Sequence, residues 1–242
     1  MLPEWETGRR IDFIPHANLK IVQSDRLFPF SIDSVLLARF VRVPVRAGSI
    51  ADLCTGNGII PFLLTRRSAA KIIGVDIQPE VCALAEEGVR INKLDEQIRI
   101  VCGDVRKIAE TAGRHCFDAV TCNPPYFTME AAPDVKVNRH LAIARHELMM
   151  TLRNAVEAAA LLLKQGGHFA LVHRPERLVE LLSLMRAAGV EPKRLQFVHP
   201  RPERAANLVL VEGTKDGRPG LTVLPAFFVH DDSGAYRKEV WE

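Results

Sequence analysis

The residues best suited to chemistry are Asn123, Pro124, Pro125 and Tyr126, which follow one another near the middle of the chain. An Asn side chain accepts hydrogen bonds through its carbonyl oxygen. Two successive prolines fix φ and remove two backbone donors, so the carbonyl groups around them act as rigid acceptors. The aromatic ring that follows can stack on a planar group. This tetrapeptide is therefore suited to hold a planar amine and to make its nitrogen a better nucleophile, and the alternative interpretation is a simple turn after a strand.

Three acidic residues come earlier in the chain, each at the end of a short apolar run. Asp52 is followed by Gly56 and Gly58, and glycines let the backbone turn tightly and approach a ligand. Asp76 ends the second run and can accept both hydroxyl groups of a ribose. Asp104 ends the third run and can receive the amino group of an adenine. Acids at three successive strand ends predict a nucleotide-like cofactor at one edge of a parallel sheet.

A dinucleotide is the weaker alternative for this cofactor. The Gly-x-Gly-x-x-Gly fingerprint needs a third glycine where the chain has Pro61. A dinucleotide site also leaves the Asn-Pro-Pro-Tyr tetrapeptide unexplained.

The elements that must position these residues alternate between short apolar strands and amphipathic helices. This alternation predicts an α/β domain with a mostly parallel sheet. The predicted strands cover residues 49–53, 71–76, 98–102, 117–122, 168–173, 194–199, 207–212 and 221–229, and the predicted helices cover 58–68, 79–92, 147–164 and 176–188. Gly166 and Gly167 are expected to close the helix over 147–164. The final strands have no helices between them, which predicts an antiparallel strand at the edge of the sheet.

The chain of 242 residues is long enough for one large domain with its own core. Residues 1–45 do not follow the alternation and are predicted to form a lid or flap ahead of a main domain over 46–242. The chain is 48% hydrophobic and 25% charged, which is typical of a globular protein. It has no apolar run of the roughly 20 residues that a membrane helix needs, and its start does not resemble a signal peptide.

The five cysteines are scattered and do not have the spacing of a zinc site or a disulfide framework. We therefore expect no metal, and free thiols suit a reducing cytoplasm.

Two segments are locally basic although the formal net charge is only +3. The basic residues of the first segment are Lys136, Arg139, His140, Arg145, His146 and Arg153, and those of the second are Lys193, Arg194, His199, Arg201 and Arg204. Phosphate binding requires such local clusters rather than a high total charge. A solvated surface is an equally good interpretation of either cluster alone.

The series of strand ends resembles the class I S-adenosylmethionine-dependent methyltransferases. The resemblance implies a Rossmann-like, mostly parallel seven-stranded sheet with helices on both faces. It implies that Asp52, Gly56 and Gly58 line the methionine end of the cofactor, that Asp76 holds the ribose, and that Asp104 with Val105 holds the adenine. The chain departs from the family at Cys54, where a glycine is common, so its first turn is expected to be slightly wider.

The segment from Phe30 to Ser34 resembles the part of these enzymes that closes over the methionyl group. Ser31 and Asp33 are therefore implied as cofactor-binding residues. Asp33 also fits a simpler role as an acid in the first turn of a helix.

The Asn-Pro-Pro-Tyr sequence resembles the amino-methylating branch of this class, whose substrates are adenine in nucleic acid, guanine in ribosomal RNA or a protein glutamine. The glutamine enzymes usually carry a long helical domain before the first motif, and only about 50 residues precede Asp52. Residues 28–37 and 199–213 resemble the bacterial tRNA adenine-N6 methyltransferases, which act on position 37 of a valine tRNA, beside the anticodon.

This resemblance implies roles for the residues around the tetrapeptide. Asn123 and the Pro124 carbonyl would hold the amine, Asn123 also borders the cofactor, and Tyr126 with Phe127 would stack on a base that has left its stack. Arg139 and Arg145 would bind phosphates of the anticodon loop. A catalytically inactive RNA-binding factor of the same fold stays open as an alternative, although such a factor needs neither Asn123 nor Asp76.

Overall fold

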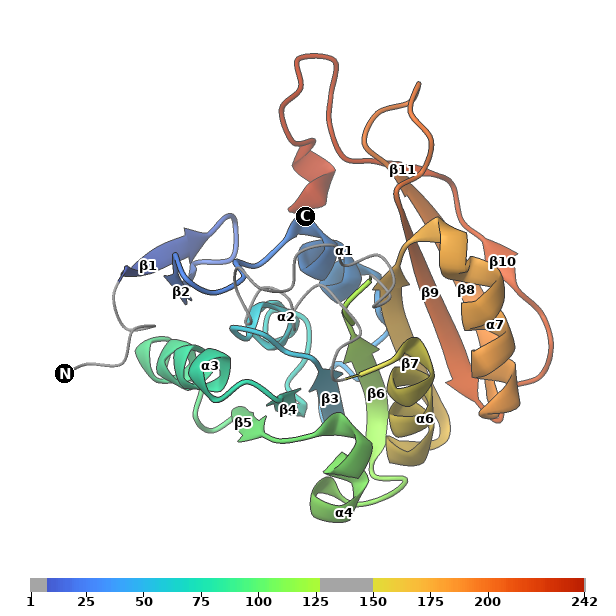
Figure 1. The fold of residues 1–242 in the computed structure, drawn as a ribbon, viewed down its shortest axis with the longest axis horizontal. Helices are drawn as coiled ribbons and strands as arrows, with labels where there is room; N and C mark the ends of the chain where they lie inside the picture. The colour runs from blue at the N-terminus through green and yellow to red at the C-terminus, as the bar shows by residue number, and fades with distance from the viewer. Residues whose placement is uncertain (1–7, 127–149, 242) are drawn as a thin grey trace.

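The computed structural model describes residues 8–126 and 150–241. Its centre is a nine-stranded sheet with the order β10-β8-β9-β7-β6-β3-β4-β5, and β11 pairs with β8 (Figure 1). The strands are β3 Ser49–Leu53, β4 Lys71–Asp76, β5 Ile98–Cys102, β6 Phe117–Cys122, β7 Leu163–His173, β8 Val190–His199, β9 Leu208–Lys215, β10 Thr222–Val223 and β11 Phe227–Phe228.

The strands β3 to β7 run parallel to one another, and β9 is antiparallel to both β7 and β8. The predicted mostly parallel sheet is therefore confirmed. Its antiparallel strand lies between β7 and β8, one position inside the end of the row formed by the seven longer strands.

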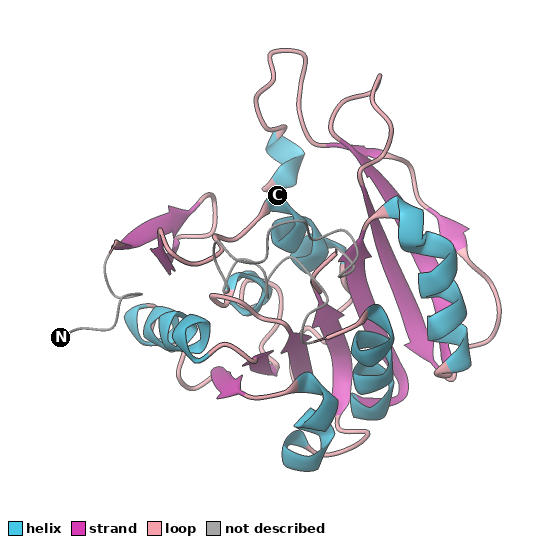
Figure 2. Cartoon of the chain, viewed as in Figure 1, coloured by secondary structure: helices cyan, strands magenta, loops and turns pink. Residues whose placement is uncertain are grey.

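Helices cover both faces of this sheet (Figure 2). They are α1 Ile32–Phe40, α2 Ile59–Leu64, α3 Pro79–Ile91, α4 Ile108–Ala112, α6 Leu152–Leu162 and α7 Leu178–Ala187. Side chains alternate between the two faces of a strand, and β3 shows the result: Ile50 packs with α1 and α2, whereas Ala51 packs with α4, α6 and α7. The described residues also form three short 3-10 turns, which are η2 Val105–Lys107, η4 Pro175–Arg177 and η5 Lys238–Val240.

The prediction for the end of the helix before β7 was wrong. Thr151 caps α6 in a reciprocal arrangement with Asn154, but the helix stops at Leu162, and Leu163 is already extended with φ −69° and ψ 135°. Leu163 is fully buried and pairs with Phe117 across the sheet. Burial in the sheet therefore ends the helix earlier than the glycines would, and Gly166 and Gly167 lie inside β7. Residues 147–149 of the predicted helix lie outside the described residues.

The strand predicted over 221–229 forms two separate short strands, β10 and β11. Pro225 lies between them and cannot donate to a neighbouring strand. The interruption is therefore local, and both pieces remain beside β8.

The first described residues form the hairpin β1 Arg9–Ile14 and β2 Leu19–Ser24, which is separate from the main sheet. Ile14 and Ile21 nevertheless share a buried cluster with Leu37 of α1 and Ile50 of β3. The hairpin therefore packs on the face of the main sheet that α1 and α2 cover. The domain boundary at residue 45 stays a prediction. Within the described ranges, no helix is both long and apolar enough to cross a membrane.

Candidate active site

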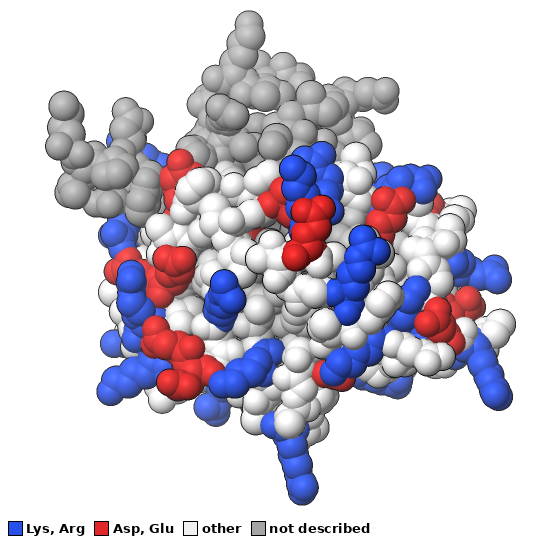
Figure 3. Space-filling model, turned by 90° about the horizontal axis from the view of Figure 1, so that it is seen from below, with Lys and Arg blue, Asp and Glu red and all other residues white. Residues whose placement is uncertain are grey.

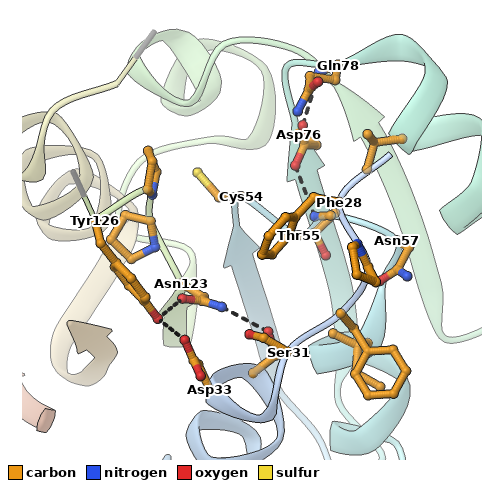
Figure 4. Close-up of a pocket in the computed structure, with 18 of the residues that line it drawn as sticks. Phe28, Ser31, Asp33, Cys54, Thr55, Asn57, Asp76, Gln78, Asn123 and Tyr126 are labelled. Atoms are coloured by element: carbon orange, nitrogen blue, oxygen red, sulfur yellow. Dashed lines mark hydrogen bonds between the residues drawn. The ribbon is translucent and has the colours of Figure 1, made fainter. Parts of the chain in front are cut away.

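A pocket of about 430 Å³ lies where the parallel strands β3, β4 and β6 end (Figure 4). Its walls come from the segment that enters α1, the turn after β3, the residues after β4 and the residues after β6, with Met150 and Arg174 added. The volume falls within the range of roughly 300–1,000 Å³ for small-molecule sites.

The turn after β3 depends on left-handed backbone conformations. Cys54, Gly56 and Gly58 have φ values of +59°, +58° and +89°. A side chain at Gly56 would meet nothing within 4 Å, so the glycine is needed for its conformation rather than for space, whereas at Gly58 a Cβ would lie 3.0 Å from the Phe62 ring. Cys54 adopts at some strain the geometry that glycine adopts freely.

Asp76 faces this turn from the end of β4. Its Oδ2 accepts the Gly56 N–H at 3.0 Å and its Oδ1 accepts the Gln78 N–H at 3.0 Å. The residue is only 8% exposed, and burial raises its pKa against the opposing effect of the backbone donors. Each carboxylate oxygen keeps a lone pair, so a fixed, hydrogen-bonded acceptor borders the pocket.

Asp52 lies just before the same turn and is fully buried. Its Oδ1 accepts from the Thr121 hydroxyl at 2.6 Å, and its Oδ2 has no hydrogen-bond partner among the described residues. Burial raises the pKa of Asp52 to about 7. An unpaired buried carboxylate oxygen is costly, and it suits a cationic group nearby.

Asp104 is held differently from the other two acids. Its Oδ1 accepts from the backbone N–H and from Nε of Arg106, both at 2.9 Å, and these bonds lower the pKa of Asp104. Asp52, Gly58, Asp104 and Val105 are not among the residues that line the pocket. Their roles toward a cofactor stay predictions.

Asn123 and Tyr126 of the Asn-Pro-Pro-Tyr segment form hydrogen bonds with residues at the start of α1 (Figure 4). Asn123 donates through Nδ2 to Ser34 Oγ at 2.9 Å. The Tyr126 hydroxyl lies 2.6 Å from Asn123 Oδ1 and 2.8 Å from Asp33 Oδ2. Burial raises the pKa of Asp33 and of Tyr126. Ser31, Pro124 and Pro125 also line the pocket, so the structure brings the predicted clamp and the predicted closing segment together.

Two residues that the sequence reasoning missed pack against Tyr126. The guanidinium carbon of Arg174 lies 5.7 Å from the Tyr126 ring centroid, and the His173 ring lies 5.2 Å away with a tilt of 59°. His173 accepts the Arg174 N–H through Nδ1 at 2.8 Å, and burial lowers its pKa to about 4, so the ring is neutral. His173 is the last residue of β7 and Arg174 follows it. Their position at a strand end is the same signal that pointed to Asp52 and Asp76.

Several predicted substrate contacts cannot be placed. Phe127, Arg139 and Arg145 lie outside the described residues. Arg201 and Arg204 are exposed in the loop after β8. Arg194 of the same basic cluster instead donates to Glu212, which is fully buried, at 3.0 Å, so its role is structural.

The surface seen from below in Figure 3 carries basic and acidic side chains intermingled, without a continuous basic patch. No group of His, Cys, Asp and Glu residues in the described ranges has the arrangement of a metal site. All five cysteines are free.

The fold is shared with solved structures whose titles include methyltransferases. A crystal structure titled as a predicted O-methyltransferase from Agrobacterium tumefaciens matches with a TM-score of 0.67 and 24% identity over 86% of this chain and 93% of that chain. A crystal structure of P. horikoshii TYW2 in complex with MeSAdo matches with a TM-score of 0.60 and 12% identity over 87% of this chain and 72% of that chain. At these identities the likeness shows the fold.

Sequence comparison places the chain more narrowly. Residues 50–146 match the family model described as a methyltransferase domain. A tRNA1(Val) (adenine(37)-N6)-methyltransferase from Tolumonas auensis is 32% identical over 183 residues, which cover 74% of this chain and 73% of the relative. One from Porphyromonas gingivalis is 28% identical over 221 residues, which cover 86% of this chain and 83% of the relative. The chain belongs to the tRNA1(Val) (adenine(37)-N6)-methyltransferase family and is an S-adenosylmethionine-dependent methyltransferase.

Proposed function

We propose that this chain methylates N6 of the adenine at position 37 of a valine tRNA, next to the anticodon. The relatives that carry this activity in their names align over most of the chain. The observation that carries the proposal is the position of Asn123, Pro124 and Pro125 on the wall of the pocket that Asp76 also borders. The proposed clamp for the amine and the proposed acceptor for the ribose thus line one cavity.

The pocket residues fit S-adenosylmethionine as the cofactor. The ligand has two cationic groups and a nucleoside, and Asp33 and Asp76 border the cavity while the unpaired Oδ2 of Asp52 lies behind the first turn. Asp76 would accept the ribose hydroxyls, Asp52 and the turn at Gly56 and Gly58 would serve the methionine end, and Ser31 and Asp33 would close over it. Asp104 with Val105 would reach the adenine from the end of β5.

The chain's own contribution to the reaction is orientation. When bound, the cofactor supplies an electrophilic methyl group whose leaving group is a neutral thioether, so no acid catalyst is needed. Asn123 Oδ1 and the Pro124 carbonyl would accept the two amine hydrogens and direct the nitrogen lone pair into the pocket. Holding both partners in this geometry lowers the barrier by positioning and by electrostatic support.

The RNA would present its base by flipping it out of the loop, which costs less than removing a base from a duplex. Tyr126, together with Phe127, would stack on the flipped adenine. Arg139, Arg145, Arg201 and Arg204 would bind phosphates of the anticodon loop. A cytoplasmic location is part of this proposal, since tRNA is the substrate.

The test is transfer of a labelled methyl group to total tRNA, ribosomal RNA and protein extract in parallel reactions. We expect label in tRNA, and then in a valine tRNA transcript but not in the same transcript with guanine at position 37. If only ribosomal RNA or only protein were labelled, the proposed tRNA substrate would be wrong and that fraction would contain the substrate. Cofactor binding by calorimetry without label in any of the three fractions would favour an inactive RNA-binding factor.

A further inference from the structure

The Tyr126 hydroxyl makes two hydrogen-bond contacts but has only one hydrogen to donate. Its oxygen lies at hydrogen-bond distance from two other oxygens, 2.6 Å from Asn123 Oδ1 and 2.8 Å from Asp33 Oδ2. A phenol carries one hydrogen, a side-chain amide oxygen carries none, and an ionised carboxylate carries none. One hydrogen cannot serve both contacts.

The orientation of Asn123 determines where a second hydrogen must be. Its Nδ2 group donates to Ser34 Oγ at 2.9 Å, so Oδ1 is the atom that faces Tyr126. With the amide in this orientation, the second hydrogen comes from Asp33 in its acid form. In that state Asp33 donates to the Tyr126 oxygen, and Tyr126 donates to Asn123 Oδ1.

We propose that Asp33 is a positioning residue that controls, through Tyr126, whether Asn123 Oδ1 is available to the target amine. This inference rests on the proposed function and deepens it. With Asp33 protonated, the Tyr126 hydrogen takes one lone pair of Asn123 Oδ1 and draws charge from the oxygen that must bind the amine. With Asp33 ionised, the Tyr126 hydrogen turns to the carboxylate and Asn123 Oδ1 is released.

The surroundings of Asp33 allow both protonation states to be reached. Ser31 faces it from its own helix start, Tyr126 from the residues after β6 and Arg174 from the residue after β7. Burial raises the pKa of Asp33, whereas Tyr126, Arg174 and Ser31 act to lower it. His173, which packs on Tyr126, is neutral and adds no charge near neutral pH.

The kinetic consequence has a definite sign. Burial raises the pKa of Asp33, so the acid form, in which Tyr126 donates to Asn123 Oδ1, persists at higher pH than for an ordinary aspartate. The rate of methyl transfer at saturating cofactor and RNA is therefore low below this pKa and rises as the pH passes through it. Loss of one neutral hydrogen bond corresponds to a change of about tenfold or less.

A spectroscopic test does not depend on the substrate. The carboxyl carbon of Asp33 and the side-chain amide of Asn123 are followed by NMR as the pH is varied, with Asp33→Asn to assign the first signal. We expect the two signals to shift with one common midpoint, and we expect the Asn123 signal to stop responding in Tyr126→Phe. An Asn123 signal that ignores the Asp33 titration in the wild-type protein would overturn the proposal.

A kinetic test uses the same variants singly and together. Asp33→Asn cannot ionise and its amide N–H can donate to Tyr126, so its single-turnover rate should no longer rise with pH and should stay up to about tenfold low. Tyr126→Phe should lose the acid limb, and Asp33→Asn with Tyr126→Phe should match Tyr126→Phe alone. Asp95→Asn, an exposed acid between α3 and β5, is the matched control and should behave as wild type.

The outcomes separate this inference from the proposed function. Additive losses in the double variant, or weakened cofactor binding in Asp33→Asn with an unchanged rate, would make Asp33 a plain cofactor contact. If the methyl group goes to an acceptor other than tRNA, the rates are measured on that acceptor, and the NMR result stands on its own.

Discussion

The proposed cofactor side of the pocket and its proposed clamp side are organised by different kinds of contact. On the cofactor side, Asp76 is held by backbone N–H groups of Gly56 and Gln78. On the clamp side, Asn123 is held by the side chains of Ser34 and Tyr126. Backbone donors in a tight turn cannot rotate away, whereas hydroxyl groups can exchange their partners. The first side is therefore preset, and the second side is adjustable.

This difference follows from the topology. Asp76 ends β4, and Gly56 lies in the turn directly after the neighbouring parallel strand β3, so the sheet itself brings them together. Asn123 and Ser34 are 89 residues apart in sequence, and they meet only because α1 packs over the sheet. We expect defects on the first side to change cofactor affinity and defects on the second side to change the rate.

The largest effect is expected from Asn123→Ala. The substitution removes the acceptor that the amine needs most as its nitrogen becomes tetrahedral, so turnover should be abolished in kcat rather than KM. Affinity for S-adenosylmethionine, measured by calorimetry, should stay nearly intact. Substantial single-turnover activity of Asn123→Ala on the tRNA transcript would contradict the clamp.

The reciprocal change on the cofactor side is Asp76→Ala. Hydrogen bonds to a charged group contribute about 1.5–3 kcal/mol each, so affinity for S-adenosylmethionine should fall at least about tenfold in a folded protein. Asp118→Ala is the matched control, because Asp118 accepts the Ser49 N–H at 2.8 Å at the opposite end of β6. Equal cofactor affinity in the two variants would remove the distinction between the two sides.

Much of the preset side was predictable from the sequence. Short apolar runs ending in acids predicted β3, β4 and β5, and the carboxyl ends of parallel strands meet at one edge. Glycines in the first turn predicted that the backbone turns tightly there, and Gly56 and Gly58 have positive φ values in that turn. These features are local, so a pattern of residues is enough to predict them.

For the adjustable side, the sequence predicted which residues take part but not which of them contact one another. The sequence indicated Asn123, Tyr126 and Asp33, yet it placed Tyr126 on the substrate and Asp33 on the cofactor. Their mutual contact spans 93 residues and depends on how α1 sits on the sheet. The end of α6 at Leu162 was missed for a similar reason, since burial of Leu163 against Phe117 is a tertiary effect.

The smallest expected effect concerns Asp52 and the stability of the cofactor-free protein. Its pKa is raised from 3.8 to about 7 by burial, so the folded state holds a proton that the unfolded chain releases. The stability from this carboxyl is complete below the unfolded pKa and is lost as the pH rises through about 7. Asp52→Asn keeps the acceptor for Thr121 and carries no charge at any pH.

We therefore expect the melting temperature of the wild-type protein to fall more between pH 5.5 and pH 8.5 than that of Asp52→Asn, by on the order of 5 °C. The pKa of Asp118 is lowered with the help of Lys164. Asp118→Asn should therefore show as large a fall in melting temperature between these two pH values as the wild type. Parallel melting curves for the wild type and Asp52→Asn would mean that Asp52 is not buried as a costly charge. If saturating S-adenosylmethionine removes the difference, a cation of the cofactor compensates that charge, and the preset side extends from Asp76 to Asp52.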